Sequence, residues 1–442
     1  MSGRLFVITG ASGSGKTQLL NNLRDAKPEI VLAPKYSSRP RRSDSDDVFH
    51  ADDIEIGKYN VVYDLNNEKY GLIFSEIEND LAKGKSVFIV LSYLRVVRDL
   101  KERFGSQVTI IYVSSAIDPA ELRRIQLERN KGSFEPKADQ INKLESQFKR
   151  LQSAIRLSRW PSLLECMAEL NEDWKNVLPQ ADSTEIRVSK IRDFHKTYVD
   201  NIHLFDHVIL NYKIDKGGVL GVDMLRQAIH ILEFYGAGGA KRLIADRPVL
   251  FVVAAASGTG KGILMETLNT SIGPDRIRVL AKEAKRDSKD NDKRDGMKAI
   301  GKDGAFDPEF DFTWFFHKDG DFEGTEYAIS SAEIEKNIQA KKPQIVVSNM
   351  GVFDQFREKY GGRVVFLYLH ALRTRDQVEK YQYKNNKSTE EAEVRIAEID
   401  KVYDTYIDRI SEFDHVLLNT AYPEDLYEQV FTLIADYGTK YE

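Results

Sequence analysis

The stretch LFVITGASGSGKTQLL, residues 5–20, decides the fold that we expect for this chain. It opens with an apolar, β-branched run, and leucines at positions 19, 20 and 23 follow at helical spacing. Between the two, residues 10–17 satisfy the pattern G-x-x-x-x-G-K-[ST] in full. A strand, a glycine-rich loop and a helix in this order indicate a phosphate-binding loop.

The residue types of this loop suit phosphate chemistry. Glycines let backbone N–H groups close around phosphate oxygens, and the N-terminus of the following helix adds positive potential. We expect Lys16 to reach the terminal phosphates of ATP, both binding and catalytic in role, and the Thr17 hydroxyl to ligate Mg²⁺. The predicted cofactor-binding residues of the first loop are Gly10, Ser12, Gly13, Ser14, Gly15, Lys16 and Thr17.

An altered copy of the loop, LFVVAAASGTGKGILM, occupies residues 250–265. Ala255 replaces the first glycine and Gly262 replaces the threonine, whereas the lysine is retained. Losing the hydroxyl removes a direct protein ligand from the metal, although a water molecule could replace it. We therefore expect phosphate binding with impaired transfer, and the predicted binding residues are Ser257, Gly258, Thr259, Gly260 and Lys261.

A second repeat shows that more than the loop is duplicated. Residues 185–211 align without gaps on residues 393–419, with 13 identities in 27 positions. A flexible GAGGA run follows the first copy near residue 236. We predict two domains, residues 1–240 and 241–442, called here the first half and the second half.

In each half, short β-branched runs alternate with helical patterns, which is typical of a parallel sheet flanked by helices. The predicted fold class is therefore α/β, with two P-loop domains, each a mainly parallel sheet flanked by helices. The first half is longer, and we assign its extra residues to a helical insert at about 133–182 in the lid region. A self-packed helical pair and a partner-binding arm both remain open for this insert.

Composition limits the other classes of function. Hydrophobic residues make up 42% of the 442 residues and the formal net charge is −5, which argues against a general nucleic-acid coat. The single cysteine, the lack of a signal-like N-terminus and the short apolar runs predict a cytoplasmic protein without a membrane partner. The oligomeric state stays open.

The next informative run is KYSSRPRRSDSDD, which begins at Lys35. Its clustered arginines suit bidentate binding of a phosphate, although such a run is also typical of a solvated basic loop. With the loop, Tyr70-Gly71, the arginine-rich run LRRIQLER and the closing FDHVILN, it resembles the guanylate kinase family. The second half follows the same pattern, and its stretch FTWFFHKDGDFEGTEYAI resembles ribose-bisphosphate phosphokinases.

This resemblance implies transfer of the ATP γ-phosphoryl group to a phosphorylated small molecule. It implies catalytic lid arginines at Arg124, Arg129 and Arg187, and it places Asn211 on the adenine side. The implied substrate-binding residues are Lys35, Arg39, Arg42, Tyr70 and Ser92 in the first half and Arg286, Tyr327 and Asn349 in the second.

Departures from the family pattern disfavour GMP as the acceptor. Guanylate kinases read guanine with two acidic residues, and the corresponding places fall near Val62 and at Ser92 in the first half. An apolar residue and a hydroxyl cannot pair with the N–H edge of guanine as a carboxylate does. The acceptor is therefore expected to be another nucleotide or a sugar phosphate.

Two alternatives to a small-molecule kinase are kept. One is a recognition or regulatory protein that binds nucleotides or phosphates without catalysis, which the GKG of the second loop favours and the GKT of the first opposes. The other is a polynucleotide-end kinase, which the acidic net charge opposes.

Overall fold

The computed structural model describes residues 3–11, 14–38, 48–55, 57–65, 68–115, 146–147, 192–212, 222–244, 250–272, 276–288, 292, 296–316, 325–386, 388–420 and 422–439. The described residues up to 115 and from 195 onward belong to one compact unit. The predicted helical insert at 133–182 lies outside the described residues, except for Ser146 and Gln147.

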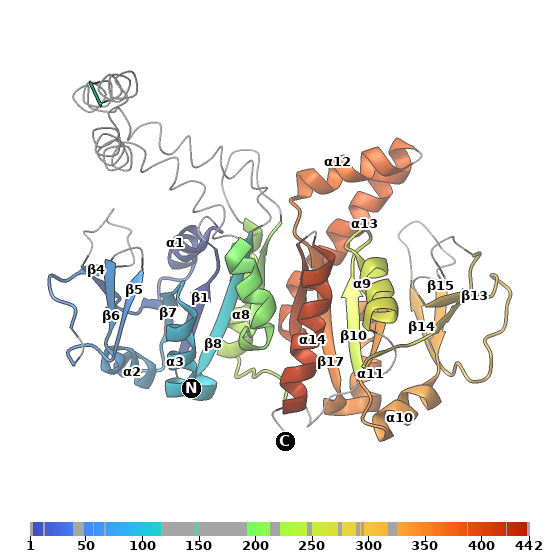
Figure 1. Cartoon of the computed structure of the whole chain (residues 1–442), viewed down its shortest axis with the longest axis horizontal. Coiled ribbons are helices and arrows are strands. Elements are labelled where there is room, and N and C mark those ends of the chain that lie inside the picture. The colour runs from blue at the N-terminus through green and yellow to red at the C-terminus, as the bar shows by residue number, and fades with distance from the viewer. Residues whose placement is uncertain are drawn as a thin grey trace, which may run out of the picture. The chain divides into compact units, whose positions relative to one another are not determined.

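The first half contains a five-stranded, all-parallel sheet in the order β2-β7-β1-β8-β9 (Figure 1). Its central strand is almost fully buried because neighbouring strands and helices cover both of its faces. Its strands are β1 (Arg4–Thr9), β2 (Val31–Leu32), β7 (Ser86–Val90), β8 (Val108–Ser115) and β9 (His207–Asn211).

The second half contains a second all-parallel sheet of five strands, in the order β11-β16-β10-β17-β18. The loop-bearing strand is again central, so the two sheets have the same topology. Its strands are β10 (Leu250–Ala255), β11 (Arg278–Val279), β16 (Gln344–Ser348), β17 (Val364–Ala371) and β18 (His415–Asn419).

Each half also carries a small, mixed four-stranded sheet on its predicted acceptor side. In the first half the order is β4-β3-β6-β5, and in the second it is β13-β12-β15-β14. The strands are β3 (Tyr36–Ser37), β4 (Phe49–His50), β5 (Val61–Leu65), β6 (Glu68–Leu72), β12 (Lys282–Ala284), β13 (Met297–Ala299), β14 (Phe312–Phe316) and β15 (Thr325–Ile329).

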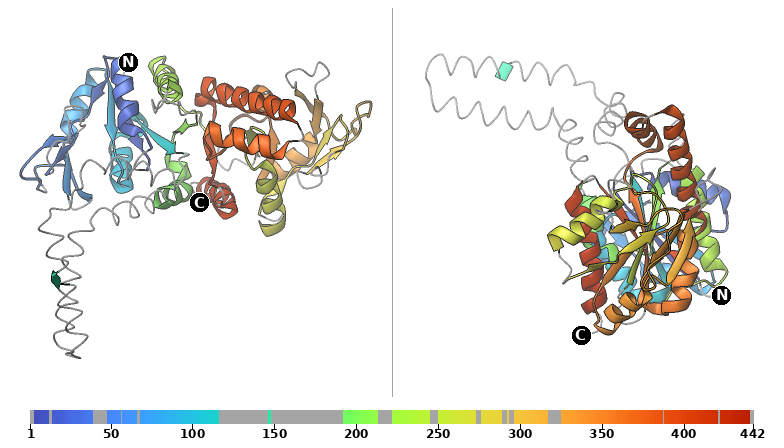
Figure 2. Two further views of the ribbon diagram at one scale, coloured as in Figure 1. Left: turned by 90° about the horizontal axis from the view of Figure 1, so that it is seen from above. Right: turned by 90° about the vertical axis from the view of Figure 1, so that its right-hand side faces the viewer.

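Helices flank the larger sheets, as Figures 1 and 2 show, which confirms the predicted α/β class. They bury apolar faces at helical spacing, as Leu19, Leu20 and Leu23 do in the first helix. Those of the first half are α1 (Lys16–Ala26), α2 (Phe74–Ala82), α3 (Leu94–Phe104) and α8 (Val222–Gly236), with short turns η1 (Gly105–Gln107) and η2 (Ile202–Leu204).

The helices of the second half are α9 (Lys261–Thr267), continued by the π-helical turn η3 (Leu268–Ile272), then α10 (Ser331–Gln339), α11 (Phe353–Tyr360), α12 (Arg375–Asn385), α13 (Thr389–Asp408) and α14 (Pro423–Thr439). Short turns η4 (Met350–Val352), η5 (Gly361–Arg363) and η6 (Ile410–Glu412) connect them. Within the described ranges, no helix combines the length and the apolarity that a bilayer crossing requires.

The two halves contact each other through equivalent tyrosines. The Tyr198 hydroxyl donates to the Val416 carbonyl at 2.6 Å, and the Tyr406 hydroxyl donates to the Val208 carbonyl at 2.7 Å. These partners are related by the alignment of residues 185–211 with 393–419. The contact is therefore reciprocal, as in a two-fold symmetric interface.

Removing either hydroxyl is expected to destabilise the protein by about 1 kcal/mol, because each substitution takes a hydrogen bond from a buried carbonyl. Tyr198→Phe and Tyr406→Phe should therefore lower the free energy of unfolding by similar amounts in urea denaturation. The control is Tyr383→Phe, whose ring is 49% exposed and whose loss of a hydroxyl should be neutral. Two interface variants as stable as this control would contradict a bonded contact.

Candidate phosphate-binding sites

The first phosphate loop connects the end of β1 to the start of α1. Gly10 and Gly15 have φ angles of 144° and 93°, a region that disfavours residues with a Cβ atom. A Cβ on Gly10 would also lie 2.4 Å from the Val113 carbonyl oxygen. The glycines at these two positions of the predicted pattern are therefore required by the backbone itself.

Lys16 is buried at the start of α1 and points back into the loop. Its Nζ donates to the carbonyls of Gly10 at 2.8 Å and Ala11 at 2.6 Å. Thr17 follows on the exposed surface of the helix. An ammonium group inside the loop and an exposed hydroxyl beside it fit a phosphate chain and a Mg²⁺ ion, with Thr17 as the residue that would hold the metal.

The second loop has the same frame with one difference in chemistry. Gly260 has a φ of 104°, and the Lys261 Nζ donates to the carbonyls of Ala255 at 3.1 Å and Ala256 at 2.5 Å. Alanine is tolerated at position 255 because its φ angle is not positive there. Among the described residues other than glycine, only Lys341 has a positive φ. Gly262 offers no hydroxyl, so the residues present here do not fit direct ligation of Mg²⁺.

Side chains of α12 lie against the second loop. A Cβ placed on Gly258 would be 3.3 Å from Gln382 Nε2 and 4.0 Å from the Tyr381 ring. Ser257, Gly258 and Thr259 line a pocket together with aromatic residues and both of these side chains. The second phosphate loop is therefore partly covered by its own half.

Aromatic side chains make up much of the lining of this pocket, and Arg373 also lines it. Burial lowers the pKa of His370 to about 3, so the imidazole is neutral at physiological pH. Burial also raises the pKa of Tyr368 and of Tyr212, which reaches the pocket from the end of β9 in the first half. The backbone carbonyl of Tyr212 accepts the Arg375 N–H at 3.0 Å.

Two of the three arginines that follow the lid pattern in the second half are paired with carboxylates, and the third, Arg373, lies over an aromatic ring of α12. Arg375 forms a bidentate contact with Asp400 at 2.9–3.3 Å and a second ion pair with Glu379. Arg395 pairs with Glu391 at 3.0 Å. Because their charges are already compensated, these two arginines are poorly suited to stabilise a transferring phosphoryl group.

The acceptor side of the first half is built on strands β3, β5 and β6. Lys35 is buried, and its Nζ donates to the Val90 carbonyl at 2.9 Å. Tyr70 stacks on Tyr63, the residue opposite it in the strand register, with ring centroids 5.3 Å apart. Ser92 lies just after β7 and is half-buried. Lys35 and Ser92 therefore lie at the carboxyl-terminal end of β7 in the five-stranded sheet.

Two predicted substrate-binding residues of the second half have partners of their own. Arg286 forms a paired contact with Asp292 at 2.5 and 3.1 Å, so this cation is neutralised internally. Burial raises the pKa of Tyr327, which stacks on Trp314 at 5.8 Å. Asn349 caps the turn η4 by accepting the Gly351 N–H at 2.9 Å.

Several predicted site residues lie outside the described residues. They are Ser12, Gly13, Arg39, Arg42, Arg124, Arg129 and Arg187. The pattern alone did not point to three residues near these sites: Asp292, which pairs with Arg286, Gln382, which lies against the second loop, and Asp400, which pairs with Arg375. In the sequence, each of them is an acidic or amide residue within a charged helical or loop segment. Such residues are common on solvated surfaces, so they do not indicate a site.

Comparisons with known proteins confirm the expected likeness to kinases. The chain is 28% identical to a guanylate kinase of Thermotoga maritima over 155 residues, 33% of this chain and 72% of that protein. It is 32% identical to ribose 1,5-bisphosphate phosphokinase PhnN of Pantoea vagans over 130 residues, 27% of this chain and 72% of that protein.

One solved structure and the family models complete the comparison. A guanylate kinase from Anaplasma phagocytophilum aligns with a TM-score of 0.30 and 12% identity, over 45% of this chain and 89% of that chain. No family model matches the chain.

Proposed function

Because the chain belongs to the family of ribose 1,5-bisphosphate phosphokinases, we propose that its first half transfers the γ-phosphoryl group of ATP to a phosphorylated small molecule. The acceptor is a nucleotide other than GMP or a sugar phosphate, since Val62 and Ser92 stand where guanine-reading carboxylates are expected. The observation that carries the proposal is the first loop, with its two positive-φ glycines, buried Lys16 and exposed Thr17.

The chemistry needs positioning more than it needs a strong base. An oxygen of the acceptor phosphate attacks the γ-phosphorus, the bond to the β,γ-bridging oxygen breaks, and ADP leaves. Lys16 would hold the terminal phosphates and Thr17 would hold Mg²⁺, which when bound neutralises charge on the phosphate oxygens. The arginines at 124, 129 and 187 would complete this role, and those at 39 and 42 would hold the acceptor.

We propose that the second half arose by duplication of the whole domain and no longer catalyses transfer. Three observations support the loss of catalysis. Gly262 lacks the metal-binding hydroxyl, the side chains of α12 cover the loop, and both Arg286 and Arg375 are paired with carboxylates. A non-catalytic phosphate-binding role for this half is therefore the second candidate function.

The test is a transfer assay with the full chain, ATP and Mg²⁺ against a panel of acceptors. The panel contains the four nucleoside monophosphates, ribose 5-phosphate, ribose 1,5-bisphosphate and a 5′-hydroxyl oligonucleotide. We expect turnover of at least one phosphorylated small molecule other than GMP. Thr17→Ala should lower kcat by about 10²-fold, whereas Thr17→Ser, which keeps the hydroxyl, should retain most of it.

Other outcomes of the same assay discriminate between the alternatives. Binding of ATP without transfer to any acceptor would favour a recognition protein. Turnover of the oligonucleotide alone would favour a polynucleotide-end kinase. Preferred phosphorylation of GMP would contradict the argument from Val62 and Ser92.

A further inference from the structure

Asn211, the last residue of β9, is a buried amide that has no hydrogen-bond partner among the described residues. It is 2% exposed, and neither its Oδ1 nor its Nδ2 has a partner in the part of the chain that the structure describes. Its Nδ2 lies 3.9 Å from the position of a Cβ on Gly15, directly behind the first phosphate loop. A buried amide left without partners is costly, so its retention here points to a second state in which it is bonded.

The second half shows that bonded state at the equivalent position. The Nδ2 of Asn419 donates to the Thr259 carbonyl at 2.8 Å. It lies 2.3 Å from the position of a Cβ on Gly260, much closer than in the first half. The same side chain in the same topology is therefore engaged with one loop and disengaged from the other.

The loop hydroxyls differ in the same way. The Thr259 Oγ1 donates to the Ala256 carbonyl at 2.9 Å, so the second loop is closed by its own groups. The equivalent Ser14 is fully buried, and its Oγ has no partner among the described residues. Asn211 and Ser14 thus lack, among the described residues, the side-chain hydrogen bonds that their counterparts Asn419 and Thr259 make.

A bond from the asparagine would orient the loop toward its ligand. In a planar trans peptide, the carbonyl of one residue and the N–H of the next point in opposite directions. If the Ser14 carbonyl turns back toward Asn211, the N–H of Gly15 turns forward into the loop. Phosphate oxygens bound by loop N–H groups require that forward orientation.

We propose that Asn211 is a positioning residue that engages the first phosphate loop when ATP binds. Its Nδ2 then donates to the Ser14 carbonyl, as Asn419 does to Thr259, and so aims the Gly15 N–H at the phosphate chain. This role replaces the contact on the adenine side that the family resemblance implied. The inference rests on the proposed function only in taking ATP as the ligand of the first loop.

The experiment compares two matched substitutions in the full chain. Asn211→Leu and Asn419→Leu keep the branched shape and remove the polar groups. Thermal unfolding of the unliganded protein and affinity for adenylyl imidodiphosphate with Mg²⁺ are both measured. The affinity is measured in a Lys261→Ala background, so that binding reports on the first loop.

The two variants should respond in opposite ways. Asn211→Leu should leave Tm unchanged or higher, because it replaces an unpaired amide, while weakening the affinity for the analogue about 10-fold. Asn419→Leu should lower Tm by roughly 2–4 °C, because the bonded Thr259 carbonyl loses its donor. Its affinity for the analogue at the first loop should stay within about twofold of the parent.

Unchanged affinity in Asn211→Leu, or a fall in Tm as large as that of Asn419→Leu, would overturn the proposal. If the leucine variant does not fold, Asn211→Ala removes the amide without adding bulk and must show the same loss of affinity. Tight analogue binding without transfer to any acceptor would refute the kinase function and leave this test intact. A parent protein that binds no analogue would refute both.

Discussion

Lys16→Ala is expected to reduce phosphoryl transfer by about 10²–10³-fold, because the loop loses the only cation that the described residues place inside it. The ammonium is buried and held against two loop carbonyls, so it is preorganised for charge that develops on the terminal phosphates. The measurement is kcat and KM for ATP with the acceptor identified in the transfer assay.

The same substitution in the second loop is the matched comparison. Lys261→Ala should lower transfer by less than about twofold if the second half is not catalytic. Equal losses in the two variants would show that both loops take part in transfer. A large loss in Lys261→Ala alone would assign catalysis to the second half and contradict the argument from Gly262.

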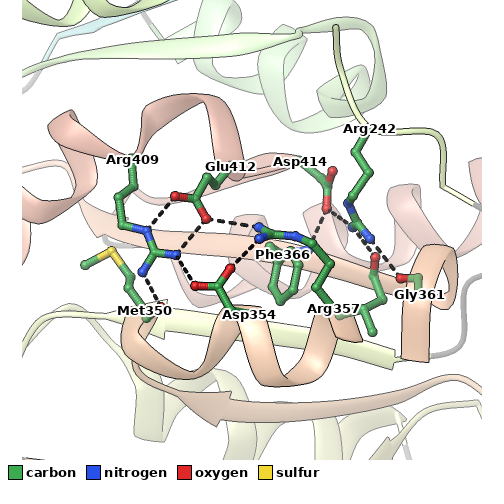
Figure 3. Close-up of polar contacts among 10 residues, drawn as sticks. Arg242, Met350, Asp354, Arg357, Gly361, Phe366, Arg409, Glu412 and Asp414 are labelled. Atoms are coloured by element: carbon green, nitrogen blue, oxygen red, sulfur yellow. Dashed lines mark hydrogen bonds and ion pairs between the residues drawn. The ribbon is translucent and has the colours of Figure 1, made fainter. Parts of the chain in front are cut away.

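Asp414→Ala is expected to lower the free energy of unfolding by about 3–5 kcal/mol. Asp414 is buried just before β18, at the amino-terminal end of the parallel strands and so at the opposite end from the phosphate loop, and it accepts the Phe366 N–H at 2.7 Å. It also pairs with Arg242 at 2.7 Å, as Figure 3 shows. Removing it leaves the Phe366 N–H without its acceptor and the largely buried guanidinium without its carboxylate, so that among the described residues its charge is opposed only by backbone carbonyls.

Further ion pairs lie beside Asp414, as Figure 3 shows. Arg409 contacts Glu412 at 2.7 Å, and Arg357 contacts Glu412 at 3.0 Å. Asp414→Asn should cost less than Asp414→Ala, because an amide oxygen can still accept the Phe366 N–H. Urea denaturation followed by circular dichroism measures both variants.

Asp206 is the counterpart of Asp414 in the first half and provides the control. It accepts the Ile110 N–H at 2.7 Å, but its cation is the more exposed Lys101 at 3.4 Å. Asp206→Ala should therefore cost about 1–2 kcal/mol. A smaller loss for Asp414→Ala than for Asp206→Ala would contradict the role given to the Arg242 pair.

The fold was largely predictable because its signals are local. The short β-branched runs of the first half were expected to be strands, and β1, β7 and β8 are three such strands. The glycines at 10 and 15 were expected from the loop pattern, and the φ angles explain why they are needed. Spacing of side chains along one segment is enough to encode such elements.

The candidate site was predictable only in part. Lys16 points into its loop, as the pattern implied, because loop and lysine are close in sequence. The pairing of Arg286 with Asp292 and the cover of Gly258 by Gln382 were not expected. Each contact depends on the path by which a loop or helix packs against the site. From the sequence alone, a polar residue in such a segment is equally compatible with exposure to solvent.

The sequence by itself determined the two phosphate loops, the α/β class and the difference between Thr17 and Gly262, since each is written in neighbouring residues and their spacing. Only the tertiary structure decided that Asn211 has no hydrogen-bond partner among the described residues while Asn419 has one, and that Asp206 and Asp414 each accept a backbone N–H at the amino-terminal end of their own sheet. The physical reason is that these bonds join residues far apart in the chain, 96 positions for Asp206 and Ile110, 48 for Asp414 and Phe366, and 160 for Asn419 and Thr259. Their geometry exists only after the strands have packed.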